Sequence, residues 1–347
     1  MFIMYDTTMS ADETMEAVEQ IRAISNEQCF LSGMSAVVTD IRDLSDKEVP
    51  VYVLLAVVLS LVVLSLTMDS FLIPIFFLLS IGMAIIYNLG TNVFMGEISY
   101  VTKALSAVLQ LGVTMDYSIF LWHSYENQKK IFAEDHKNAM AHAIAQTVTS
   151  VVGSSVTTVA GFIALCFMSF TLGMDLGIVM AKGVVFGVIG CVTILPSMIL
   201  IFDKLLEKTR HKAILPDIGK LSGFVTKRFP VFLLIFAVLL LPAIYGQKNA
   251  EVYYDLAGTL PEDLQSFMAN QKLDEEFDMN STHILLADSH MKAKDAQTML
   301  DRIDKVDGVK TAIGIDSIVG PSVPKDMIPQ SVREIIEDDK YQMILIS

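Results

Sequence analysis

Cysteine is scarce in this chain, and the clusters that hold metals or build disulfide scaffolds are missing. The 347 residues include three cysteines, Cys29, Cys166 and Cys191. They form no CxxC or Cys/His arrangement, and the six histidines show no ligand spacing. We therefore expect no metal site, no disulfide framework and no bound cofactor.

Sequence motifs of common enzymes are missing as well. The segments that flank the apolar part of the chain contain no GxGxxG, Walker loop, HExxH or GxSxG. No nucleophile with a base and no pair of catalytic carboxylates stands at a recognisable spacing. An enzyme is the least favoured class of function, and without a basic patch in these segments we expect no nucleic-acid partner.

Apolar sequence, by contrast, is in excess. Hydrophobic residues make up 53% of the chain and the mean hydropathy is +0.52, whereas soluble domains contain about 45–50% apolar residues. The excess is concentrated in six runs long enough to cross a bilayer, which takes about 17–25 residues. The six predicted spans are 51–67, 71–89, 101–122, 144–170, 176–202 and 229–246. The expected fold is a membrane α-helical bundle of six transmembrane helices with partial α+β pieces outside the membrane at both ends.

The distribution of basic residues predicts the orientation. Between the fifth and sixth spans, residues 203–228 carry seven Lys or Arg against three Asp or Glu, and such loops stay in the cytoplasm. Both termini are then extracytoplasmic. Residues 1–49 have no cleavable signal peptide that would carry them across the membrane, so we expect a further helix upstream.

The two outer segments show patterns of small α+β pieces. Ser10 and Glu13 have the spacing of a helix-capping pair, and Leu31–Thr39 resembles a strand. After the last span we expect a strand, an amphipathic helix and a second strand, forming a βαβ unit, at 283–287, 293–303 and 309–313.

An acidic residue lies inside the third apolar run. Asp116 is followed by Tyr117 and preceded one helical turn earlier by Gly112. A carboxylate in lipid costs several kcal/mol, about 3 on insertion scales, so it is a candidate ion or proton site. The alternative is a charge that reaches the interface, but Asp is short and lies roughly 9 Å from the inner edge.

Small and hydroxyl-bearing residues form stripes on the next two spans. Such stripes permit close helix packing, and hydroxyls can also bond to a neighbouring carboxylate. Lys182, beside the second stripe, is expected to extend outward near Asp175. The stripes comprise Thr147, Ser150, Ser154, Thr157 and Gly161 on the fourth span, and Gly183, Gly187 and Gly190 on the fifth.

These residues resemble a known family. The run Gly112–Leu121 is similar to the fourth-helix signature of the MMPL transporters, within the resistance-nodulation-division superfamily. Ser154–Phe162 resembles the fifth helix of that family, Thr193–Pro196 the end of its sixth, and Leu260–Asp263 the entry to its second outer domain.

The resemblance implies twelve helices in two halves, each half interrupted after its first helix by an outer porter domain. This chain would contain helices two to seven and would stop within the second porter domain. The implied division is the end of the first porter domain at 1–49, five helices within 50–203, a cytoplasmic linker at 204–228, the sixth helix at 229–246 and the start of the second porter domain at 247–347.

The resemblance also implies a mechanism. Asp-Tyr pairs on helices four and ten act as a proton relay in the family, so Asp116 and Tyr117 would form half of one, supported by Thr157 and Ser154. We expect export of lipid-like or hydrophobic molecules across the cell membrane, driven by the proton-motive force. The expected partners are membrane lipids, an amphiphilic substrate, protons and the missing transporter half.

Two alternatives remain open at this point. The same helices would serve a lipid-sensing or scaffolding protein that transports nothing. The chain would otherwise be an inactive fragment, or a half-transporter that needs a partner half.

Overall fold

The computed structural model describes residues 3–26, 28–132, 135–211, 219–251, 258, 260–277, 279, 283–314 and 337–347. They fall into two compact units, one drawn from Met1–Ile41 with Tyr253–Ser347 and the other from Arg42–Val252. Each unit is considered by itself.

The larger unit is helical. Six helices in the described part of the chain are long and apolar enough to cross a membrane. This confirms that there are six candidate spans, although the helix of the fourth ends at Leu165, before the predicted end at 170. The helices are α2 (Met34–Thr67), α3 (Leu72–Gly90) with the short helix η1 (Thr91–Met95), α4 (Tyr100–Phe132), α5 (His136–Leu165), α6 (Thr171–Lys208) and α8 (Phe229–Asn249), with α7 (Gly219–Lys227) before α8.

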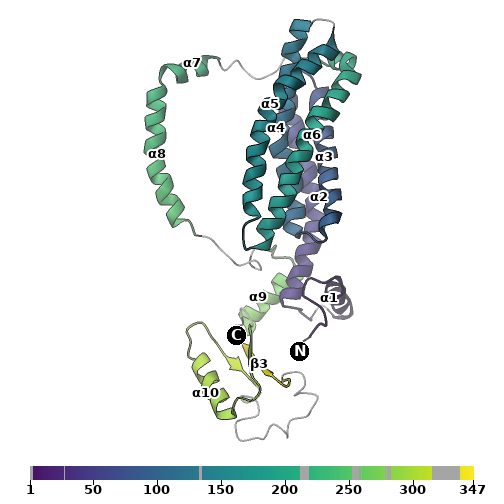
Figure 1. Cartoon of the computed structure of the whole chain (residues 1–347). Helices are drawn as coiled ribbons and strands as arrows, with labels where there is room; N and C mark the ends of the chain where they lie inside the picture. Colours follow the sequence, from purple (N-terminus) through teal and green to yellow (C-terminus); the bar gives the residue numbers. More distant parts are fainter. Residues whose placement is uncertain are drawn as a thin grey trace. The chain divides into compact units, whose positions relative to one another are not determined.

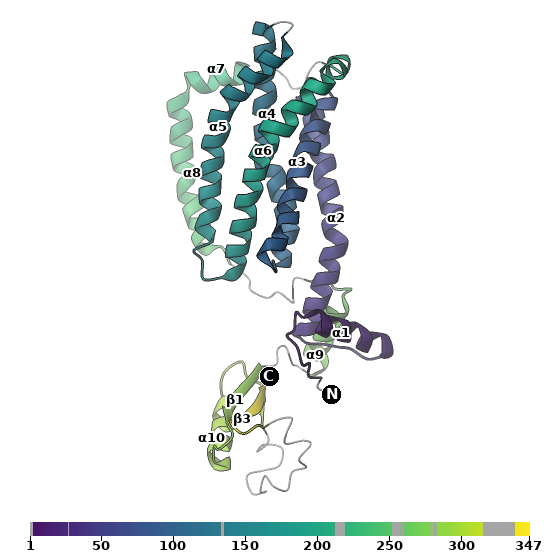
Figure 2. The same ribbon diagram turned by 45° about the vertical axis from the view of Figure 1, so that its right-hand side comes forward.

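Helices α3, α4, α5 and α6 pack side by side (Figures 1 and 2). Helices α4, α5 and α6 are longer than their apolar runs because polar residues continue the helical hydrogen bonding beyond the spans. At the start of α5, for example, the Asp135 carboxylate accepts from the backbone N–H of Asn138 at 3.1 Å and caps the helix.

The two ends of this bundle are named here by their residues. The η1 end contains η1 and the turn between α5 and α6. The Asp69 end contains the α2–α3 turn, the last turns of α4 and α6, and the first turn of α5.

Two local predictions were wrong. Ser10 does not cap the first helix, whose N-cap residue is Ala11 and has no side-chain cap. Residues 34–39 are the start of α2 and not part of a strand. Ala36, Thr39 and Asp40 are buried, which is the i, i+3, i+4 spacing of one helical face. A short apolar stretch fits both the 3.6-residue repeat of a helix and the two-residue repeat of a strand. Here the burial of one face against other segments favours the helix.

The smaller unit contains α1 (Asp12–Ile24), α9 (Gln265–Phe277), α10 (Ala293–Ile303) and a three-stranded sheet. The strand order is β1-β3-β2, and β3 (Tyr341–Ile346) is antiparallel to both β1 (His283–Asp288) and β2 (Ala312–Ile313). Figure 2 shows α10 beside this sheet.

The predicted strand–helix–strand order is confirmed, with α10 at its predicted bounds and β2 shorter than predicted. The strand β3 was not predicted, and it lies between the two strands of the βαβ unit. Leu300, Ala312 and Ile344 form the core where α10 covers the sheet.

Candidate functional site

Asp116 lies on an open face of the bundle. Its side chain is exposed, as are Gly112 one turn before it and Phe120 one turn after it. These positions are four residues apart, so they share one face of α4. Among the described residues the Asp116 carboxylate makes no hydrogen bond or ion pair. A carboxylate in the middle of a membrane-spanning helix therefore faces away from α3, α5 and α6.

Tyr117 points in another direction. Its side chain is 3% exposed, and the side chain of Thr158 on α5 is a polar neighbour of its hydroxyl. Consecutive helical residues project about 100° apart, since a turn takes 3.6 residues. The structure thus places the two members of the predicted relay side by side in sequence but on different faces of α4.

The hydroxyl stripe on α5 faces outward at four of its five positions, whereas Thr147 is buried. Ser154, Thr157 and Gly161 are exposed, and the Thr157 hydroxyl bonds to the Gly153 carbonyl of its own helix at 3.2 Å. The residue that reaches Tyr117 is Thr158. Hydroxyl residues occur in adjacent pairs at 154–155 and 157–158, so both sides of α5 carry polar groups. The spacing along the sequence therefore could not show that Thr158, and not Thr157, lies beside Tyr117.

Two of the predicted packing glycines lie at close helix contacts. A Cβ added at Gly183 would lie 2.7 Å from Asn88 Nδ2 and 2.8 Å from Gln110 Oε1, and one at Gly187 would lie 2.9 Å from Thr114 Cβ. A Cβ at Gly112 or Gly161 would have nothing within 4 Å. The packing role of these last two glycines stays a prediction.

Buried amides surround the Gly183 contact, and they were missed from the sequence. Asn88 and Gln110 are both fully buried, and Asn88 Nδ2 donates to Gln110 Oε1 at 2.9 Å. Gln110 Nε2 in turn donates to the Gly183 carbonyl at 3.0 Å. The sequence could have indicated this pair, because both amides lie inside apolar runs and polar side chains within spans pair with one another.

Lys182 extends toward the η1 end as predicted, although its partner is different. Its ammonium donates to Asn92 Oδ1 at 2.6 Å and not to Asp175. Asn92 belongs to η1, which no apolar pattern placed near α6.

The Asp69 end holds a network of ion pairs. Arg210 bonds to Asp69 at 2.9 Å and also to Glu126, while Trp122 Nε1 donates to Asp69 at 3.0 Å. Burial favours the neutral form of Asp69, but the hydrogen bonds from Trp122 and Arg210 outweigh it, so the pKa of Asp69 lies below its ordinary value. The network ties the α2–α3 turn to α4 and to the segment after α6.

Asp203 on α6 is the centre of a second group at the same end. Its carboxylate accepts from the Tyr125 hydroxyl at 3.0 Å and pairs with Lys129 at 3.3 Å and with His136 Nδ1 at 3.0 Å. Lys129 also pairs with Glu207 at 3.1 Å. One carboxylate thus joins α4, the start of α5 and α6.

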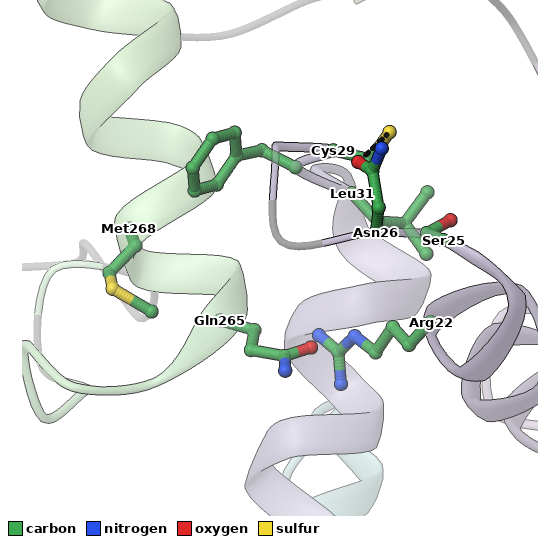
Figure 3. A pocket seen from close by; sticks show the side chains of 8 residues that line it. Arg22, Ser25, Asn26, Cys29, Leu31, Gln265 and Met268 are labelled. Carbon is green, nitrogen blue, oxygen red and sulfur yellow. Dashed lines mark hydrogen bonds between the residues drawn. The ribbon is translucent and has the colours of Figure 1, made fainter.

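A pocket of about 340 Å³ lies in the smaller unit. Figure 3 shows the guanidinium of Arg22 and the carboxamide of Gln265 pointing toward one another along one side of it. Arg22 is held by Asp40 through two hydrogen bonds of 2.6 and 3.1 Å, which balance its charge. Phe30, Leu31 and Met268 supply apolar lining. The pocket is therefore neutral and of mixed polarity.

The sequence profile of the MMPL family matches residues 4–222. The chain belongs to the MMPL family. Membership agrees with the Asp116–Tyr117 pair on α4 and with the six candidate spans. The chain is a multi-pass membrane protein.

Two of the named relatives are similar over most of this chain and the third over a third of it, and all three are longer than this chain. The siderophore exporter MmpL5 of Mycobacterium tuberculosis is 24% identical over 342 residues, which cover 92% of this chain and 35% of MmpL5. The probable transport protein MmpL12 of the same organism is 22% identical over 285 residues, 78% of this chain and 25% of MmpL12. The protein MJ1562 of Methanocaldococcus jannaschii, named as a membrane protein, is 35% identical over 115 residues, 33% of this chain and 27% of its own length. The chain thus spans about a quarter to a third of these relatives.

Proposed function

We propose that this chain forms part of a proton-driven exporter of lipid-like or hydrophobic molecules in the cell membrane. The observation that carries the proposal is the exposed carboxylate of Asp116 on a membrane-spanning helix. A charge facing lipid is costly, so such a residue pairs with a partner or lines a polar path. Family membership supports transport as the purpose of that path.

The open face around Asp116 is proposed to receive the other half of the transporter. Gly112 and Gly161 leave room for close approach of a helix, and Ser154 and Thr157 offer hydroxyls to it. Polar groups of that half would hold the Asp116 carboxylate while it is charged. Protonation removes the charge and with it the reason to hold those partners, which shifts the two halves relative to one another.

Tyr117 is proposed to pass this change into the bundle. It follows Asp116 directly on α4 and lies beside Thr158 on α5. A movement of α4 at Asp116 therefore changes the contact between α4 and α5. We place the Asp69 end in the cytoplasm, because residues 203–228, which follow α6, carry seven basic side chains against three acidic ones.

The pocket of the smaller unit suits an amphiphilic cargo. Its mixture of amide and apolar side chains matches a molecule with a neutral polar head and an apolar body. This unit is proposed to lie outside the membrane, as part of the porter domains.

The test is made on the complete transporter, with both halves, in proteoliposomes that contain a pH-sensitive dye. Asp116→Asn keeps the size of the side chain and removes its titration. We expect proton flux and the export of a fluorescent lipid both to be lost. Asp175→Asn, on α6 near the η1 end, is the matched control and should keep both. Proton-driven export that survives Asp116→Asn would refute the proposal and favour a protein that senses or scaffolds lipids.

A further inference from the structure

A row of buried polar side chains runs along the inner face of α4. Thr102, Ser106, Gln110 and Thr114 follow one another at intervals of four residues, and each is no more than 1% exposed. This row, named here the α4 seam, faces α3 and α6 and lies on the opposite side of α4 from Asp116. A polar row is unusual inside an apolar bundle, because polar groups within spans need partners.

The polar groups in one part of the seam have hydrogen-bond partners within the bundle. The Gln110 side chain uses its oxygen for Asn88 and its nitrogen for the Gly183 carbonyl, and the Thr114 hydroxyl donates to the Gln110 carbonyl at 2.7 Å. Gly183 and Gly187 permit this, because a side chain at either position would occupy the place of these groups.

Three polar atoms have no partner among the described residues, one in the seam and two beside it. Asn88 Oδ1, Asn92 Nδ2 and Thr102 Oγ1 are buried without a hydrogen bond among the described residues. The residues that carry them are 0%, 6% and 0% exposed. Buried polar atoms in proteins are almost always hydrogen-bonded, and an unpaired one calls for water or an ion.

The chemistry of these atoms selects water. One is an acceptor, one is a donor, and the hydroxyl is both, whereas a cation would serve only acceptors and an anion only donors. The Lys182 ammonium, bonded to Asn92 at the same place, would also repel a metal cation. Buried waters characteristically make two to four hydrogen bonds to such groups.

The seam has one polar end and one apolar end. Toward η1 it reaches Asn92 and the half-buried Lys182. In the other direction the row continues to Ser118, which is 1% exposed and follows Tyr117 on α4, and beyond these two residues Leu121, Phe77 and Leu195 are fully buried in the apolar core. Water entering from the η1 end would therefore stop at Tyr117.

We propose that the α4 seam binds a file of internal water molecules that joins the aqueous phase at the η1 end to Tyr117. The inference rests on the proposed function for its purpose, which is to bring protons to the α4 segment that carries Asp116. In such a file each water accepts one proton and donates another, so no charged species accumulates. Asn88 is the narrow point, because it bonds directly to Gln110 across the seam.

Thiol accessibility tests the file without any transport measurement. Cys29, Cys166 and Cys191 are first replaced by Ala in the full chain. Single cysteines are then introduced as Ser106→Cys, Thr114→Cys and, as a control in the apolar core, Ala143→Cys, and the protein is placed in liposomes. A small water-soluble thiol reagent is added, since reaction requires a hydrated thiolate. We expect both seam cysteines to react at least about tenfold faster than the control.

A second substitution tests the order of sites along the file. Asn88→Leu should slow labelling of Thr114→Cys about tenfold and leave Ser106→Cys, on the η1 side, unchanged. Unchanged labelling at Ser106→Cys also shows that the variant is folded. A Thr114→Cys rate equal to that of Ala143→Cys would overturn the water file.

Proton flux in the complete transporter separates this inference from the proposed function. If both hold, Asn88→Leu slows the flux and Asp116→Asn abolishes it. If Asn88→Leu blocks labelling while the flux is unchanged, protons do not use the seam and its proposed role is overturned. If Asp116→Asn leaves the flux intact, the proposed function fails even though the labelling pattern is retained.

Discussion

The two ends of the helical bundle are built from the same four helices but with opposite interiors. Toward η1 the interior carries amides and hydroxyls, three of whose atoms have no partner among the described residues. Toward Asp69 it is an apolar core of fully buried side chains such as Phe77, Leu121 and Ile199. Ion pairs around Asp69 and Asp203 close that end.

The difference indicates which end can change. An apolar core is closely packed and resists rearrangement, and the ion pairs join four chain segments that are distant in sequence. Polar groups can exchange one partner for another, or for water, at small net cost. We infer that the Asp69 end is the rigid base of the bundle and that movements linked to Asp116 occur toward η1.

The largest expected effect comes from opening a cavity at the rigid base. Leu121→Ala removes a fully buried side chain and should lower the free energy of unfolding by about 2–5 kcal/mol. The matched control is Leu109→Ala on the same helix, which is 39% exposed and should cost far less. Unfolding in mixtures of mild detergent and SDS measures both. Equal losses would remove the contrast between core and surface.

Overpacking between the two ends should have the next largest effect. Gly187→Leu would drive a side chain into Thr114 on α4, and we expect a loss of about 1–3 kcal/mol. Gly82→Leu on α3 is the control, since a Cβ there has nothing within 4 Å. The same unfolding assay applies, and a stable Gly187→Leu protein would show that α4 and α6 are less closely packed than described.

The ion pairs of the Asp69 end should make its stability depend on pH. The pKa of Asp69 is lowered from 3.8 in the folded state, so its contribution is complete above that value and is lost as the pH falls through the lower, folded pKa. Asp69→Asn should therefore flatten the decline of the unfolding midpoint at acidic pH. Glu97→Gln, an exposed acidic residue toward η1, should leave the decline as it is. Identical pH profiles for Asp69→Asn and the unmodified protein would contradict this account.

The smallest effect is expected in the seam. Thr102→Val keeps the shape of a buried side chain and removes a hydroxyl that has no protein partner. Its unfolding free energy should change by less than about 1 kcal/mol. A loss as large as that of Leu121→Ala would mean that the hydroxyl is held as firmly as the apolar core.

Much of the architecture could be predicted because membrane spans follow from length and apolarity alone. The six spans and the bounds of α10 depend on local sequence, as does the family signature around Asp116. The start of α2 was predicted wrongly because 31–39 is too short to distinguish a helical period from a strand period. The strand β3 was missed because it joins the sheet between two strands that precede it in sequence.

The candidate site could be predicted in its residues but not in its geometry. Asp116 and Tyr117 were selected as one pair, yet the first is exposed and the second is buried beside Thr158 of α5. The partners of Asn88, Gln110 and Lys182 lie on other helices, so no spacing along the chain reveals them.

The amino-acid sequence alone determined that this protein crosses the membrane, how many times, and which carboxylate lies within a span, since each depends on the cost of placing local groups in lipid. The tertiary structure alone decided that Asp116 faces outward, that Tyr117 faces inward, and that the two ends of the bundle have unlike interiors. The physical reason is that a helix presents every side of itself to possible neighbours, and only packing between segments distant in the chain chooses which side is buried.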